Sequence, residues 1–287
     1  MKIAITGSDG YIGTRLQSEF QNDSSIELVC LSILTDTAPY VKIQFNHDSL
    51  VRVFSGVDCI VHLAAKKNVL DYSDFINNIE LTNMVVEAAI DAGVSKFIFA
   101  SSISVYSDET TIPWREDTAA DSESLYGVSK LTCEHLLKVK ATKAGMIFTV
   151  LRFGHVIGED MPGNYMIPSF FRRASTNEPL TVIGKSVAKR ELVDVIDICR
   201  AVHWAAINSC SDNTVLNIGS GIAVTNLEIA NYIAGAFGNV KVIYDDSQNE
   251  GIKSSCMDIT KAKHLGFIPL FTPESSIYRV AAFYKGE

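Results

Sequence analysis

The chain alternates between short, nearly continuous apolar runs and longer segments in which apolar residues recur every three or four positions. Runs rich in β-branched residues predict strands at Lys2–Thr6, Glu27–Leu31, Val41–Phe45, Cys59–Leu63, Lys96–Ala100, Ile147–Phe153 and Val215–Ile218. Segments of helical period predict helices at Tyr11–Phe20, Ser49–Phe54, Asp74–Ala92, Ser124–Ala144, Met166–Thr176, Ile196–Ile207, Asn226–Phe237 and Pro273–Tyr284. Apolar strands that alternate with helices are typical of a parallel sheet covered on both faces. The pattern therefore predicts an α/β protein with a doubly wound parallel sheet.

The pattern changes at about Gly154, where glycines and prolines become frequent. We expect residues 1–155 to form the sheet domain, with a returning strand near 214–219, and residues 156–287 to form mainly a smaller C-terminal lobe. Two helix starts in this lobe have local signals. Thr225 with Glu228 has the capping-box pattern, and Thr272 precedes a proline at the first helical position.

Charge and cysteine usage limit the classes of function. The 287 residues carry a formal net charge of −8, whereas nucleic acids and anionic membranes are bound by clustered Lys and Arg. No segment reaches the ~18 apolar residues of a membrane span, so we expect neither nucleic acid nor membrane as a partner. The six cysteines are scattered singly, without the spacing of a metal site. We therefore expect reduced cysteines, no bound metal and a cytoplasmic protein.

The first predicted strand runs into TGSDGYIG, which opens the first predicted helix. Gly7, Gly10 and Gly13 allow a tight turn, close approach of a diphosphate to the helix N-terminus, and close packing of helix on strand. The alternative is that the glycines serve only the turn. Because the motif follows the very first strand, we favour a dinucleotide site that includes Tyr11 and Ile12 as well.

The end of the second predicted strand bears on the choice of dinucleotide. An acidic residue there commonly binds the ribose 2′-hydroxyl of NAD, and this chain has Ser32 at that position. A serine can hydrogen-bond a 2′-phosphate that a carboxylate would repel, although no arginine stands beside it. The cofactor is thus expected to be NADP or NAD, with NADPH favoured.

Small side chains follow the fourth and fifth predicted strands, where a flat cofactor lies in a doubly wound sheet. The segments are VHLAAKKNV and FASSISVYS, and the residues expected at the cofactor are Leu63, Ala64, Ala65 and Ser101. Simple close packing is the alternative explanation for such residues. Together with the glycine loop, they favour a cofactor site.

LYGVSK places Tyr126 and Lys130 one turn apart on the same helix face. An isolated tyrosine and lysine at this spacing are usually ordinary surface residues. Here they follow a glycine loop and the strand-end hydroxyl of Ser102. A nearby ammonium and a cationic nicotinamide would lower the phenol pKa, so that Tyr126 could exchange a proton with a carbonyl or carbinol oxygen while Ser102 hydrogen-bonds it.

In this order, the motifs resemble the extended branch of the short-chain dehydrogenase/reductase superfamily, the nucleotide-sugar epimerases, dehydratases and reductases. The matching segments cover nearly the whole chain: TGSDGYIG, VHLAAKKNV, FINNIELTN, SSISVY, YGVSK, LRFGHVIG, KRELVDVIDICRA, VLNIGSG and DITKAKHLGFIP. The resemblance implies a Rossmann-type fold with a substrate-binding C-terminal lobe. It implies Ser102, Tyr126 and Lys130 as catalytic residues, Lys130 also on the nicotinamide ribose, and Asn78 near the cofactor.

The resemblance further implies a nucleotide-sugar substrate and a homodimer. The substrate residues expected from it are Ser104, His155 and Arg190, with base recognition in the loops Asn164–Phe171 and Leu180–Gly184. The dimer would form a four-helix bundle from the helices Asp74–Ala92 and Ser124–Ala144.

Departures from the family pattern guide the choice of reaction. Ile103 and Ser104 replace the Asp-Glu pair of the sugar dehydratases, which argues against a 4,6-dehydratase. His155 replaces an asparagine that reaches the diphosphate in many epimerases. This, the short chain and the missing second-strand acid favour an NDP-4-keto-6-deoxysugar 4-ketoreductase. The alternatives are an NAD-dependent nucleotide-sugar 4-epimerase and a cofactor-binding regulator without turnover.

Overall fold

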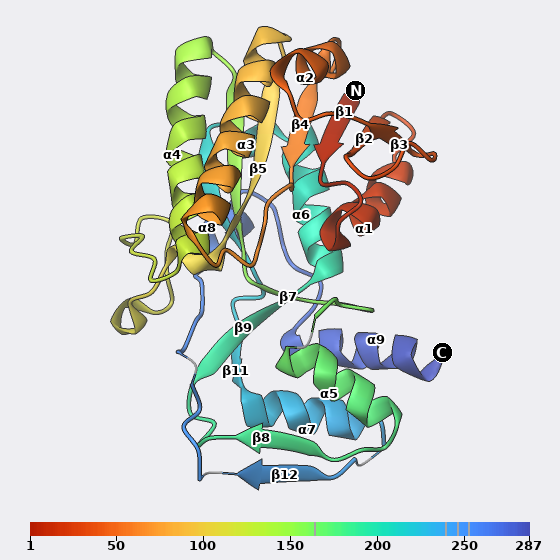
Figure 1. The fold of residues 1–287 in the computed structure, drawn as a ribbon. Helices are drawn as coiled ribbons and strands as arrows, with labels where there is room; N and C mark the ends of the chain where they lie inside the picture. The colour runs from red at the N-terminus through yellow and green to blue at the C-terminus, as the bar shows by residue number, and fades with distance from the viewer. Residues whose placement is uncertain (164, 239, 246, 252) are drawn as a thin grey trace.

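The computed structural model describes residues 1–163, 165–238, 240–245, 247–251 and 253–287. Its main sheet has seven parallel strands in the order β10-β6-β5-β4-β1-β2-β3, in the upper part of Figure 1. The strands are β1 (Lys2–Thr6), β2 (Glu27–Ser32), β3 (Tyr40–Lys42), β4 (Cys59–His62), β5 (Lys96–Ser102), β6 (Ile147–Phe153) and β10 (Thr214–Ile218). This order is that of a Rossmann-type doubly wound sheet, and the predicted fold class is confirmed.

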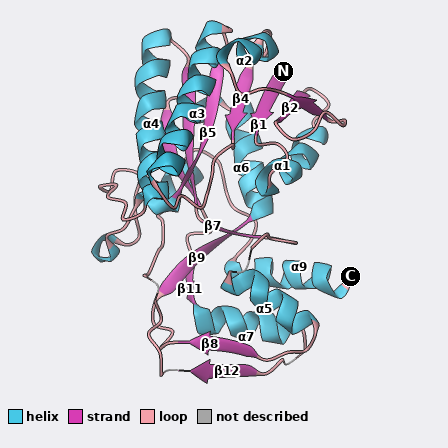
Figure 2. Ribbon diagram, viewed as in Figure 1, coloured by secondary structure: helices cyan, strands magenta, loops and turns pink. Residues whose placement is uncertain are grey.

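Helices cover both faces of the sheet (Figure 2). On one face, α1 (Tyr11–Gln21) and α6 (Val195–Ile207) pack together over a core that includes Ile5, Val61 and Leu216. On the other face lie α2 (His47–Phe54), α3 (Tyr72–Asp91) and α4 (Leu125–Ala144), over a second core. The inner strands β1, β4, β5 and β6 are buried on both sides, which explains why their sequences are nearly continuous apolar runs.

The third strand is shorter and earlier than the expected Val41–Phe45. Beyond Lys42 one more backbone bond to β2 is made, from the Ile43 N–H to the Ser32 carbonyl at 2.9 Å. Asn46 then begins α2 by accepting a hydrogen bond from the Ser49 backbone N–H, as is typical of an N-cap.

A second group of elements lies below the main sheet in Figure 1. It contains β7 (His155–Ile157), β9 (Lys189–Asp194) and β11 (Ala223–Thr225) in one small sheet, and β8 (Leu180–Ile183) with β12 (Val242–Asp245) in another. The helices α5 (Met166–Ser175), α7 (Asn226–Ala236) and α9 (Pro273–Lys285) pack on one another around a core of their own. Both capping signals are confirmed, at Thr225 and at Thr272.

Short elements complete the chain. They are the single-turn helices η1 (Ile103–Val105), η2 (Glu109–Thr111) and η3 (Ser209–Ser211), and α8 (Thr260–His264). In the described part of the chain, no helix combines the length and the apolar character that crossing a membrane requires. Nor do the described residues hold a group of three or more metal-ligating side chains.

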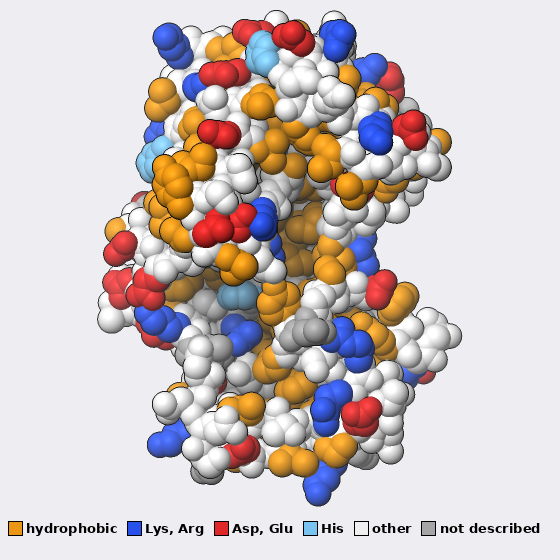
Figure 3. Space-filling view, in the orientation of Figure 1, with side chains coloured by type: hydrophobic (Ala, Val, Ile, Leu, Met, Phe, Trp, Pro, Cys, Tyr) orange, Lys and Arg blue, Asp and Glu red, His pale blue; other side chains and the backbone are white. Residues whose placement is uncertain are grey.

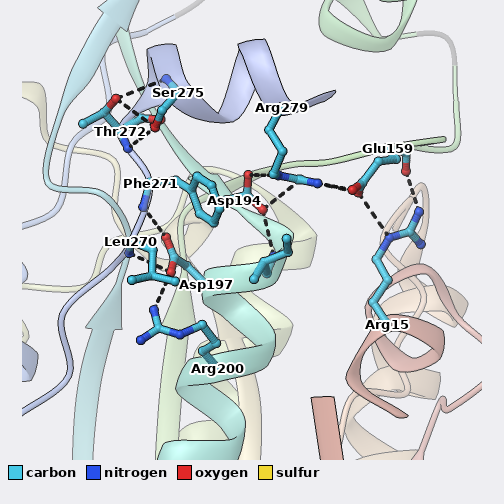
Figure 4. Close-up of polar contacts among 11 residues, drawn as sticks. Arg15, Glu159, Asp194, Asp197, Arg200, Leu270, Phe271, Thr272, Ser275 and Arg279 are labelled. Carbon is cyan, nitrogen blue, oxygen red and sulfur yellow. Dashed lines mark hydrogen bonds and ion pairs between the residues drawn. The ribbon is translucent and has the colours of Figure 1, made fainter. Parts of the chain in front are cut away.

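A polar cluster joins the main sheet to the lower elements (Figure 4). Arg279 on α9 makes a two-point contact with Asp194, at 3.0 and 2.9 Å, and also pairs with Glu159. Glu159 in turn pairs with Arg15 on α1. Asp194 is buried and caps α6, so it joins α6 to α9, while Glu159 extends the cluster to α1.

Candidate active site

The glycine loop lies against the segment that follows β4. Gly7 has φ +71, and a Cβ at this position would stand 2.8 Å from the backbone nitrogen of Ala64. Gln17 fixes the loop by donating to the Ser8 carbonyl at 2.7 Å. The N-cap of α1 is Gly10, whose position has no side-chain cap, and the first turn contains no acidic residue. The first N–H groups of α1 are therefore free of competing carboxylates, and a dinucleotide diphosphate fits there.

Tyr11 and Ile12, also expected at the cofactor, lie in different surroundings on α1. Ile12 packs partly against the core beneath α1. The Tyr11 ring lies under the Arg15 guanidinium, at 4.0 Å, and close to Gly158. Tyr11 thus contacts the polar cluster that joins the two parts of the molecule, and burial raises the pKa of its phenol well above 10.

Asn78 holds the segment after β4 in place. Its side-chain oxygen accepts from the backbone N–H of Lys66 at 2.8 Å, and its side-chain nitrogen donates to the Lys66 carbonyl at 2.9 Å. This two-point contact positions the loop that carries Leu63, Ala64 and Ala65. Asn78 is buried, so it acts on the expected cofactor surface through this loop.

The two strand-end serines of β5 have different surroundings. The hydroxyl of Ser101 is buried and donates to Glu134, so it is not free to contact a cofactor. Ser102 caps η1 by accepting from the Ser104 N–H at 3.1 Å, and it also hydrogen-bonds Tyr126. Ser102 is half-exposed and lies beside the phenol.

Tyr126 and Lys130 lie in the first turns of α4. Ser124 caps this helix by accepting from the Gly127 N–H at 3.0 Å. A Cβ on Gly127 would stand 1.9 Å from the Ser104 carbonyl oxygen, so only glycine lets α4 approach η1 this closely. Lys130 is only 4% exposed. Its ammonium donates to the Ala100 carbonyl at 2.7 Å and lies 5.8 Å from the centroid of the Tyr126 ring.

The protonation of this pair differs from the sequence expectation. Burial raises the pKa of Tyr126 to about 12, against the lowering effect of its hydrogen bond to Ser102. Burial also lowers the pKa of Lys130 to about 8. The Lys130 ammonium is bound to the Ala100 carbonyl. In this state Tyr126 is a protonated phenol, which can donate a proton and must lose one before it acts as a base.

A buried ion pair supports α4, and it was not predicted from the sequence. Arg152 on β6 contacts Glu134 on α4 at 3.0 and 2.6 Å, and each side chain is 6% exposed. Glu134 also accepts from Ser101, and Arg152 donates to Tyr106 at 2.6 Å. The sequence could have indicated this pair, because Arg152 stands within a mostly apolar strand. An arginine buried in such a strand is almost always paired.

A pocket of about 260 Å³ opens beside Ser104. Its walls come from η1, the start of α4, the loop with Trp114, and the segments at His155 and Ser255. The space-filling view is hollowed between the upper and lower parts, with a histidine and basic side chains on the lower side (Figure 3).

Two buried polar atoms near this pocket lack a partner among the described residues: Nε of Arg190 and Oγ of Ser255. A buried orphan donor indicates a ligand group that it can bind. The His155 ring lines the pocket and is accessible to solvent, yet the surrounding protein and the nearby Arg190 lower its pKa to about 4. A neutral histidine beside a cationic arginine suits an anionic group of a substrate.

The sequence is also similar to a known protein family. The sequence model described as "NAD dependent epimerase/dehydratase family" matches residues 3–219, which include the glycine loop, Ser102, Tyr126 and Lys130. The chain belongs to this family. It is an enzyme of the extended short-chain dehydrogenase/reductase type, as the resemblance implied, in a family of nucleotide-sugar epimerases, dehydratases and reductases.

Three relatives in this group are informative. The crystal structure of UDP-N-acetylglucosamine 4-epimerase from Bacillus cereus is 35% identical, with a TM-score of 0.91 and complete coverage of both chains. The structure of MoeE5 in complex with UDP-glucuronic acid and NAD is 26% identical over 100% of this chain and 99% of that one, with a TM-score of 0.87. A dTDP-4-dehydro-6-deoxyglucose reductase from Escherichia coli is 26% identical, over 96% of this chain and 95% of the relative.

Proposed function

We propose that the protein is an NAD-dependent 4-epimerase of a UDP-sugar. The supporting observation is that Ser102, Tyr126 and Lys130 lie close together, with Ser102 hydrogen-bonded to Ser104 of the pocket wall, in a chain that matches a UDP-N-acetylglucosamine 4-epimerase from end to end. That match removes one reason for favouring a reductase, since the chain is as long as a solved epimerase.

The residues have separate roles in this reaction. When bound, the nicotinamide supplies a hydride acceptor for C4 of the sugar and then a donor that returns the hydride to the opposite face. Tyr126 must first lose its own proton to solvent, which the positive charge of a bound oxidised nicotinamide would favour. The phenolate then takes the proton from the C4 hydroxyl in the oxidation and gives it back in the reduction, while Ser102 hydrogen-bonds the same oxygen. Lys130, with its ammonium fixed on Ala100, holds the nicotinamide ribose. The transfers balance, because hydride and proton both return to the sugar.

The lower elements provide the substrate site in this proposal. Arg190 offers its unpartnered Nε to the diphosphate, and Ser104 and His155 line the pocket in which the sugar turns. The loop Asn164–Phe171 is proposed to contact the base, although Asn164 lies outside the described residues.

A 4-ketoreductase remains the second candidate, because the chain is also similar along its length to the Escherichia coli reductase. It would use the same three residues for a single reduction and release the oxidised cofactor. A 4,6-dehydratase is disfavoured, since the residues after Ser102 are Ile103 and Ser104 and carry no acid.

We also propose a homodimer through α3 and α4. These helices pack on each other, and α4 leaves Val139 68% exposed on its outer side. Sedimentation of the purified protein should give twice the mass of one chain, and a Val139→Glu variant should shift it toward a monomer. A monomeric wild-type protein would contradict this arrangement.

Two measurements separate the candidates. In the first, a sample of the purified protein is denatured and the released cofactor is identified. In the second, native protein is incubated with UDP-N-acetylglucosamine or UDP-glucose, and the products are resolved by NMR. An epimerase should release NAD and convert a UDP-sugar to its C4 epimer without added cofactor. A protein without bound cofactor that instead oxidises a nicotinamide cofactor only with a 4-keto sugar nucleotide would be the reductase.

A further inference from the structure

The end of β2 is occupied by a carboxylate from the glycine loop. Asp9 accepts a hydrogen bond from Ser32 through Oδ2 at 2.6 Å, across 23 residues of sequence. The Ser32 hydroxyl also accepts from the backbone N–H groups of Leu34, at 2.9 Å, and Thr35, at 3.2 Å. Its single hydrogen and its lone pairs are all used, and Ser32 is 1% exposed. Ser32 therefore has no group left for a cofactor phosphate.

Asp9 stands where the adenosine ribose is recognised in this fold class. It precedes Gly10, the N-cap of α1, and it meets the carboxyl end of β2, which pairs with β1 up to Thr6 and Leu31. In doubly wound sheets a carboxylate at this strand end accepts from the ribose 2′-hydroxyl. Asp9 is half-exposed. Among the described residues its side chain has one hydrogen bond, from Ser32 to its Oδ2 atom. The Oδ1 atom of Asp9 can therefore accept a second hydrogen bond.

The charge around Asp9 disfavours a 2′-phosphate. The segment from Ile33 to Val41 contains no lysine or arginine, and Ile33 and Leu34 are exposed and apolar. The next basic residue along the chain is Lys42 on β3, which is exposed and pairs in register with Ser32; among the described residues, no hydrogen bond or ion pair joins it to Asp9. A phosphate on the 2′-oxygen would bring up to two negative charges next to the Asp9 carboxylate. At separations of about 5 Å and partial burial, such repulsion corresponds to roughly a hundredfold loss of affinity or more.

We propose that Asp9 is the cofactor-selecting residue: it accepts from the adenosine ribose 2′-hydroxyl and excludes a 2′-phosphate, so that the protein binds NAD(H) and rejects NADP(H). This inference rests on the proposed function only in using the same nicotinamide cofactor. It reverses the preference for NADPH expected from Ser32. The second strand lacks its usual acid because the glycine loop supplies one.

The test measures binding and does not depend on turnover. Dissociation constants for ADP-ribose and for its 2′-phosphorylated form are measured by calorimetry on protein freed of cofactor. The same titrations are run on Asp9→Asn, Asp9→Ala and, as a matched control, Asp36→Asn. Asp36 is exposed in the loop after β2 and carries the same charge without contacting Ser32.

Wild-type protein and Asp36→Asn should bind ADP-ribose about a hundredfold more tightly than the 2′-phosphorylated form, and both Asp9 variants should lose most of this ratio. An unchanged ratio in a folded Asp9 variant, or a wild-type preference for the 2′-phosphorylated ligand, would overturn the inference. Because the ratio is read without sugar substrate, a protein that shows it but epimerises no UDP-sugar would refute only the proposed function.

Discussion

The buried pair of Glu134 and Arg152 should contribute more to stability than any exposed ion pair on the same helix. Glu134→Ala leaves the Arg152 guanidinium buried, with Tyr106 as its remaining side-chain partner and no carboxylate. Breaking a buried pair from one side costs about 3–5 kcal/mol, because the remaining charge is neither paired nor hydrated. For a chain of this size that corresponds to a Tm lower by about 10 °C.

Glu87→Ala is the matched control. Glu87 pairs with Lys140 between α3 and α4, but the two side chains are 47% and 31% exposed. An exposed pair contributes about 0–1 kcal/mol, so the Tm should fall by no more than about 3 °C.

Thermal unfolding followed by circular dichroism compares the two variants. A third protein, Glu134→Met with Arg152→Leu, removes both charges and should be more stable than Glu134→Ala alone, since no buried charge is left unpaired. If Glu134→Ala and Glu87→Ala lose the same small amount, the ion pair is not the support that its burial indicates.

Other parts of the site give further predictions. Gly127→Ala should lower kcat and Tm together, because the new methyl would stand 1.9 Å from the Ser104 carbonyl oxygen in η1. The control Gly235→Ala, whose new methyl would have its nearest neighbour 3.4 Å away, should be neutral or stabilising. Equal effects of the two variants would contradict the close approach of α4 to η1. Burial, reinforced by the nearby ammonium of Lys130, lowers the pKa of His62 from 6.5 to about 3. The unfolded state therefore takes up this proton first as the pH falls. Between pH 6.5 and 3 the wild-type stability should decline relative to His62→Gln by up to about 1.4 kcal/mol per pH unit, measured by urea unfolding at pH 7 and 5; parallel curves would refute it. Arg190→Met should raise KM for the UDP-sugar by about 10–100-fold with a smaller change in kcat. The control Lys189→Met, at the exposed neighbouring position, should leave KM unchanged. An unchanged KM in Arg190→Met would show that the arginine does not bind the substrate.

The main sheet could be predicted because its inner strands are buried on both faces and appear as apolar runs. The small strands β7, β8, β11 and β12 could not, since each has three or four residues and is paired only through contacts distant in sequence. Ser102, Tyr126 and Lys130 were predicted as catalytic from their order and spacing, and the structure brings Ser102 and Tyr126 into contact; their catalytic role stays a prediction.

Side-chain partners were harder to predict than positions. Ser32 was interpreted without Asp9, because the hydrogen bond between them joins residues 23 positions apart. The phenol of Tyr126 was expected to have a lowered pKa, but burial, which spacing does not reveal, raises it to about 12. Ser101 was expected at the cofactor, and its hydroxyl is instead held by Glu134.

The central claim is that Tyr126 exchanges a proton with the C4 oxygen of a UDP-sugar while the hydride leaves and returns. The most direct test uses UDP-N-acetylglucosamine deuterated at C4, with product analysis by NMR and mass spectrometry. The account predicts that the C4 epimer forms with its deuterium retained, and that Tyr126→Phe, still folded and still binding cofactor, slows this conversion by about 10²–10⁴-fold. Epimer formation at the wild-type rate in Tyr126→Phe, or loss of the C4 deuterium to solvent, would contradict it.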